Sequence, residues 1–133
     1  MPAYSVAAAA VAIEAPLKWV ENLLSRYEVP GAEKGMQGAA RRLSVETIVS
    51  LAIIRDLTVV LGVPVAGAVG WCAAIARGDN TVPEARGRVR IVADMPAIRD
   101  HVARGLSRAV ESLVTPKRGR PRARGRRMKV PNE

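Results

Sequence analysis

Proline and glycine residues divide the apolar part of this chain into short segments. Pro30-Gly31, Gly62 with Pro64, and Gly78 each follow a stretch whose apolar residues recur at helical spacing. Proline cannot continue a helix, and glycine favours the left-handed residue that ends one. We therefore expect a mainly α protein. The expected helices span residues 6–13, 16 to just before 30, 45–61, 64–76 and 95–114.

Three of these helices have a polar residue placed to cap the first turn. Ser5, Ser44 and Asp94 directly precede the first, third and last expected helices, and such side chains accept hydrogen bonds from free backbone N–H groups. Two helices also carry clear apolar stripes. The second has Leu17, Val20, Leu23 and Leu24, and the last has Met95, Ile98, Val102, Leu106, Val110 and Leu113.

The core must be aliphatic. Hydrophobic residues make up 49% of the chain but aromatic residues only 3%, with no Phe. Ala, Val, Ile and Leu must therefore fill the interior. We expect Trp19 to pack on this core rather than stack on a base, and Trp71 to lie in the core or at an oligomer contact.

The chain offers few groups for catalysis or metal binding. Cys72 is its only cysteine and His101 its only histidine, which excludes a disulfide within the chain and a Cys/His zinc cluster. A glycine-rich phosphate loop and a G-x-S-x-G motif are also missing. We expect a binding protein and no enzyme, without metal or cofactor. Cys72 should be a small buried hydrophobe, and His101 should lie on the surface.

The positive charge is concentrated at the C-terminus. The net charge is +9. Residues 1–115 carry thirteen Lys and Arg against eleven Asp and Glu, whereas residues 116–133 carry eight against Glu133 alone. A dense block of like charges repels itself and buries nothing apolar, so we expect this tail to be disordered when free. An anionic partner is indicated.

A membrane location is the weaker alternative. Residues 57–76 contain no charged side chain, and about 20 apolar residues can span a bilayer. Gly62 and Pro64 split this stretch, however, and many of its residues are Ala, so two packed helices are expected instead. The N-terminus lacks a basic region before its apolar run, which argues against a signal peptide.

Two short segments outside the helices suggest β structure. Residues 31–42 are polar and rich in glycine, which predicts a turn or small hairpin with basic corners. Residues 88–92 alternate between Arg and β-branched residues, which predicts a strand with Val89 and Ile91 facing inward. Residues 78–86 read as a linker, and because of it we favour pairing of the last helix with a second copy over docking on the first domain.

The order of these elements resembles the DNA-binding domain of MerR-family regulators. Tyr4-Ser5-Val6 is similar to the opening of that family, and residues 17–24 fall where its recognition helix falls. Gly38-x-x-Arg41-Arg42-Leu43-Ser44-x-Glu46 is similar to its wing-to-helix segment, and Leu61-Gly62-Val63-Pro64 to the junction of the paired helices after the wing. The resemblance covers about residues 3–76. The chain lacks the family's sensing cysteines, which suggests a minimal relative without an effector ligand.

The resemblance implies a set of DNA-contacting residues. The second helix would lie in the major groove, the wing would contact flanking backbone, and Ser5 at a helix N-terminus could donate to a phosphate. A solvated surface is the alternative for each side chain. The candidates are Ser5, Lys18, Asn22, Arg26, Lys34, Gln37, Arg41 and Arg42.

The tail resembles an AT-hook, whose core is Arg-Gly-Arg-Pro between basic residues. Here the motif comprises Arg118, Gly119, Arg120, Pro121 and Arg122. Gly119 has no Cβ and allows close approach to the floor of a narrow A·T minor groove, where the negative potential attracts arginine. Pro121 favours an extended backbone.

Together these observations predict a winged helix-turn-helix protein of four parts. Residues 1–77 would form the MerR-like domain, 78–86 the linker, 87–114 a strand–helix unit that could dimerise, and 115–133 the tail. We expect a small cytoplasmic, nucleoid-associated regulator, bacterial or from a phage, that binds double-stranded DNA as a homodimer. The alternatives are a nucleoid-type architectural protein and an RNA-binding protein, although sparse aromatic residues argue against RNA.

Overall fold

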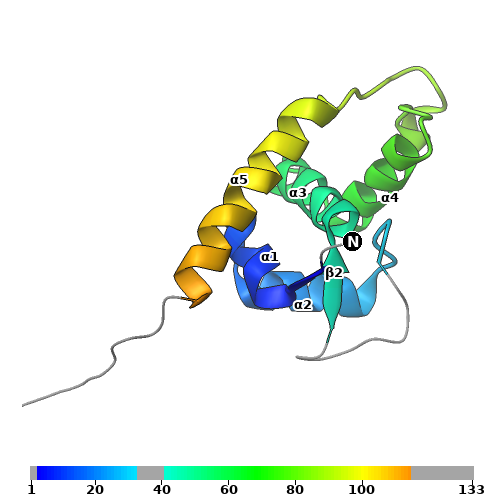
Figure 1. The fold of residues 1–133 in the computed structure, drawn as a ribbon. Coiled ribbons are helices and arrows are strands. Elements are labelled where there is room, and N and C mark those ends of the chain that lie inside the picture. The colour runs from blue at the N-terminus through cyan, green and yellow to red at the C-terminus, as the bar shows by residue number, and fades with distance from the viewer. Residues whose placement is uncertain (1–2, 33–40, 115–133) are drawn as a thin grey trace, which may run out of the picture.

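The fold is mainly helical, as the sequence predicts. The structure, a computed structural model, describes residues 3–32 and 41–114. This part of the chain has five α-helices and a two-stranded sheet, and Figure 1 shows their arrangement. The elements are β1 (Ala3–Ser5), α1 (Val6–Ala12), α2 (Leu17–Arg26), β2 (Arg42–Ser44), α3 (Val45–Val59), α4 (Val65–Ala76), the 3-10 turn η2 (Pro83–Ala85) and α5 (Met95–Val114).

The predicted caps start three of the helices. The Ala8 N–H donates to Ser5 Oγ at 3.0 Å at the start of α1, and the Thr47 N–H donates to Ser44 Oγ at 3.3 Å at the start of α3. The Ala97 N–H donates to Asp94 Oδ1 at 3.1 Å in the first turn of α5. Local sequence therefore determines where these helices begin.

The break between α3 and α4 also follows the prediction. α3 ends at Val59, two residues earlier than expected, and Gly62 has a left-handed φ of +71°. Its backbone reverses the chain and allows the Val63 N–H to donate to the Leu57 carbonyl at 2.9 Å.

Over residues 3–32 and 41–114, no helix is both long and apolar enough to cross a membrane.

The sheet joins two helix starts that are distant in sequence. β1 and β2 are antiparallel, with Tyr4 opposite Leu43 and Ser5 opposite Arg42. β1 leads directly into α1 and β2 directly into α3. Pairing these strands therefore fixes the start of α1 beside the start of α3.

The core is aliphatic, as predicted. Its largest fully buried side chains include Leu43, Ile48, Leu51 and Ile54, and α2 adds Val20. Trp19 and Trp71 are each half-buried against this core. The prediction that Trp19 packs on the core is confirmed.

The preference for pairing α5 with a second copy is wrong for the middle of this helix. α5 lies across α1 and α3 of its own chain (Figure 1). Val102, Leu106 and Ala109 are buried there, so the central part of the predicted stripe is covered within one chain. Val110, further along the stripe, stays 44% exposed.

The predicted strand at residues 88–92 does not form. An isolated bridge between Thr81 and Arg90 is the β pairing that the structure shows here. Val89 is 50% exposed and Val92 81% exposed, so the inward face predicted for Val89 is also wrong. Alternating β-branched residues favour a strand only where a neighbouring strand accepts their ladder, and here the Val89 carbonyl and the Ile91 N–H pair with Val82 and Asn80 of a short loop.

Candidate nucleic-acid interface

Helix α2 presents one polar face and buries the other. Lys18, Asn22 and Arg26 are exposed at a spacing of four residues, which places them along one side of the helix. Val20 and Leu23 on the other side are buried. Arg26 lies in the last turn, where a cation interacts favourably with the helix dipole. Three predicted contact residues therefore share one accessible surface.

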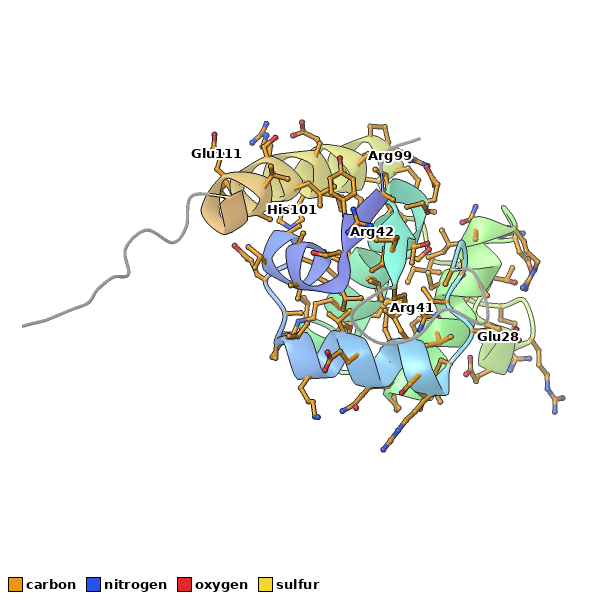
Figure 2. All side chains as sticks on the ribbon, turned by 60° about the horizontal axis from the view of Figure 1, so that its bottom comes forward. Glu28, Arg41, Arg42, Arg99, His101 and Glu111 are labelled. Atoms are coloured by element: carbon orange, nitrogen blue, oxygen red, sulfur yellow. The ribbon has the colours of Figure 1, made fainter. Side chains whose placement is uncertain are left out.

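Arg41, the residue before β2, brings one further predicted contact residue next to this helix, and Arg42 lies on β2 beside β1. Arg41 Nη1 donates to the Leu24 carbonyl near the end of α2 at 3.4 Å, and Arg41 is half-buried. Arg42 is exposed and its Nη2 donates to the Ala3 carbonyl at 3.3 Å. Figure 2 labels Arg41 close to α2 and Arg42 beside the two-stranded sheet. Arg41 thus places the start of β2 close to the end of α2.

Ser5 is committed to its cap. Its Oγ accepts the Ala8 N–H, and Ser5 stands opposite Arg42 in the sheet. The hydroxyl proton stays available for another acceptor, because a hydroxyl can donate while it accepts. The phosphate contact suggested for Ser5 stays a prediction.

A contact that the sequence did not predict joins α2 to α3. The guanidinium of Arg55 in α3 lies 5.0 Å from the centroid of the Trp19 ring in α2. Such a cation–π contact is worth about 0.5–1 kcal/mol at an exposed site. Arg55 is the one Lys or Arg in α3, and that position was the available signal.

A second unpredicted contact joins α5 to the start of α3. Arg99 donates to both carboxylate oxygens of Glu46, at 2.5 and 3.0 Å. The hydrogen bond from Arg99 lowers the pKa of Glu46, and the same bond raises the pKa of Arg99. The two residues are 53 positions apart, so no local spacing could have indicated the pair.

A small cavity of about 290 Å³ lies beside this ion pair. Cys72 lines it together with Ser50, Ile53 and Met95. The Cys72 thiol is buried and donates to the Ser50 carbonyl at 3.7 Å, and burial raises its pKa. This confirms Cys72 as a buried hydrophobe and indicates an unreactive thiol.

The remaining chemistry-bearing residues are isolated. His101 is exposed, as predicted. Residues 3–32 and 41–114 contain no group of three or more His, Cys, Asp or Glu side chains that could hold a metal ion.

Seven of the predicted contact residues lie outside the part of the chain that the structure describes. They are Lys34, Gln37, Arg118, Gly119, Arg120, Pro121 and Arg122.

Comparison with known proteins adds no relative to this picture. No family model, curated protein or solved structure matches the chain. Evidence for function therefore comes from the residues described above.

Proposed function

We propose that this protein binds double-stranded DNA and acts as a small transcriptional regulator. In this proposal α2 enters the major groove and residues 118–122 contact an A·T-rich minor groove nearby. The observation that carries it is the exposed face of α2. Its Lys18, Asn22 and Arg26 point away from a core that holds the opposite face of the same helix.

These side chains have the chemistry that duplex DNA requires. Asn can make a bidentate contact with adenine, and Lys and Arg can contact guanine or phosphate. The face is short, because eight residues of helix rise about 12 Å. The major groove is about 12 Å wide and admits one helix, because a helix with its side chains is about 10–12 Å in diameter.

The neighbouring basic strand supports the same interface. Arg41 joins the start of β2 to the Leu24 carbonyl of α2, and Arg42, the next residue, is exposed on β2. Contacts to phosphates fix the register of a protein on DNA, whereas contacts to base edges specify the sequence. Arg42 and Lys18 are suited to the first role and Asn22 to the second.

The tail would raise affinity through its attachment to the folded part. Two weak sites on one chain bind more tightly than either alone, because the second contact becomes intramolecular. The tail carries most of the net positive charge, so it should dominate the salt dependence of binding.

Selection from a pool of randomised duplexes tests this proposal. The full chain should enrich a defined motif, and Asn22→Ala should relax the preference at one or two base positions. Asp100→Asn on α5, which lies away from α2, serves as the control and should enrich the motif of the unchanged protein. Enrichment of the same motif by Asn22→Ala and by the unchanged protein would contradict the assignment of α2.

A further inference from the structure

A second group of arginines lies in the connection between α4 and α5. Arg86, Arg88 and Arg90 are all exposed and occur at every second position. The sequence indicated a linker and a strand here, and neither prediction gave these arginines a role. Their arrangement therefore needs its own explanation.

Backbone hydrogen bonds hold this connection in a defined shape. The Val82 N–H donates to the Val89 carbonyl at 2.9 Å, and the Ile91 N–H donates to the Asn80 carbonyl at 2.8 Å. Val82 is buried, and Trp71 Nε1 of α4 donates to Glu84 Oε1 at 2.8 Å. The three arginines therefore extend from residues 80–91, whose backbone has a defined shape and which we call the ribbon. Because this backbone is already ordered, less conformational entropy is lost when the arginines bind a ligand.

The turn that presents them is strained. Arg86 adopts a left-handed conformation with φ +54° and ψ +42°, and Gly87 follows with φ +83°. A side chain with a Cβ rarely occupies this region, and such outliers are a reason to look for function. The residue in the strained conformation is therefore Arg86 itself.

The positive charges of this ribbon are not neutralised within the described residues. Asp79 faces Arg77 at 3.8 Å and accepts from Thr81, while Glu84 accepts from Trp71. Over residues 3–32 and 41–114, no acidic side chain lies within ion-pair distance of Arg86, Arg88 or Arg90. Three adjacent cations without acidic partners attract an anionic ligand.

This ribbon is separate from α2. Figure 1 shows the α4–α5 connection at the far end of α4, while α2 lies at the opposite end of the molecule. A single straight duplex bound at α2 would therefore not also contact the ribbon. Either the duplex bends around the protein or a second duplex segment binds.

We propose that Arg86, Arg88 and Arg90 form a second phosphate-binding surface, which holds the backbone of duplex DNA apart from the segment bound at α2. Guanidinium groups match phosphate geometry through paired hydrogen bonds. Arg88 and Arg90 are separated by one residue, and in this proposal their guanidinium groups contact different phosphates. The surface makes no base contact and adds affinity without sequence preference. It rests on the proposed function.

The salt dependence of DNA binding tests this surface with the full chain. Arg88→Gln with Arg90→Gln removes two cations but leaves the strained Arg86 unchanged. Arg104→Gln with Arg108→Gln on exposed positions of α5 removes the same charge and is the matched control. Each phosphate contact contributes about −0.9 to the log–log salt slope. The ribbon variant should have a slope shallower by up to about 1.8, and the control should keep the original slope.

The outcomes separate this surface from the assignment of α2. Equal slopes for the ribbon variant, the control and the unchanged protein would overturn the second surface. A shallower slope together with an unchanged motif for Asn22→Ala would uphold the ribbon and reject α2 as the sequence-specific element. Capture of a labelled duplex by protein already held on an immobilised duplex, kept by the Arg104→Gln/Arg108→Gln control but lost in the Arg88→Gln/Arg90→Gln variant, would show that the ribbon binds a second segment. Absence of capture with a shallower slope would place the ribbon on a bent single duplex.

Discussion

Gly105 of α5 lies directly against the backbone of Ala12 in α1. A Cβ added at Gly105 would stand 2.2 Å from the Ala12 carbonyl oxygen and 2.9 Å from its Cα. Backbone atoms cannot move aside as a flexible side chain can. The close approach of the two helices therefore requires glycine at this position. This approach sets how α5 packs on α1.

The Gly105→Ala variant should consequently be less stable. Overpacking of this kind costs about 1–3 kcal/mol, which exceeds the roughly 0.5–1 kcal/mol that replacing a helical Gly by Ala usually contributes. Urea unfolding followed by circular dichroism would measure the loss. Gly70→Ala in α4 is the control, because a Cβ there meets nothing within 4 Å, and it should raise stability. A gain in stability from both variants would mean that α5 does not pack on α1 in this way.

The ion pair of Glu46 with Arg99 predicts a pH dependence of stability. The pKa of Glu46 is lowered in the folded protein, so its contribution is fully present above the ordinary glutamate pKa and declines as pH falls through the lowered folded value. The two side chains are 58% and 46% exposed, and such pairs contribute about 0–1 kcal/mol. A double-mutant cycle with Glu46→Gln and Arg99→Gln should give a coupling of that size at pH 7.

The coupling should approach zero at acidic pH and should weaken in high salt. Urea unfolding of the four proteins of the cycle at several pH values would measure it. A coupling that grows as the pH is lowered would contradict the described contact.

The stack of Arg55 on Trp19 predicts a linked effect on stability and fluorescence. Arg55→Gln should lower the free energy of unfolding by about 0.5–1 kcal/mol and should change the emission of Trp19. Trp71→Phe in the background removes the second indole signal. Glu84→Gln in the same background is the matched control, because Glu84 contacts residue 71 in the unchanged protein, and Trp19 emission should stay constant. Unchanged Trp19 emission in Arg55→Gln would argue against the stack.

Local signals in the sequence determine much of this fold. Ser5, Ser44 and Asp94 cap their helices as predicted, and Gly62 takes the left-handed conformation that ends α3. Caps and glycine turns depend on residues within a few positions of each other. The apolar spacing in between was enough to place the helix ends to within about three residues.

Contacts between residues far apart in the sequence could not be predicted from such local signals. β1 and β2 have three residues each, too few to show a clear alternation. The docking of α5 depends on Gly105 meeting Ala12, and the pairing of Arg41 with the Leu24 carbonyl joins positions 17 residues apart. The strand expected at residues 88–92 failed for the converse reason, since its local pattern found no neighbouring strand.

The candidate interface was predicted in part. The exposed face of α2 followed from the apolar stripe on its other side, because burial of Val20 and Leu23 turns Lys18 and Asn22 outward. The half-buried position of Arg41 and the stack of Arg55 on Trp19 depend on how α2 packs in three dimensions. Periodicity within one helix carries no information about those neighbours.

The most direct test of the central proposal is a duplex-binding titration with and without the tail. The full chain and a version ending at Val114 would be titrated on A·T-rich and G·C-rich duplexes at several salt concentrations. The eight cations of the tail could contribute a log–log slope of up to about −7. The shortened chain should bind more weakly, lose the A·T preference and keep its preference for the motif selected by the full chain. Failure of the shortened chain to bind any duplex at any salt concentration would contradict DNA binding by the folded part.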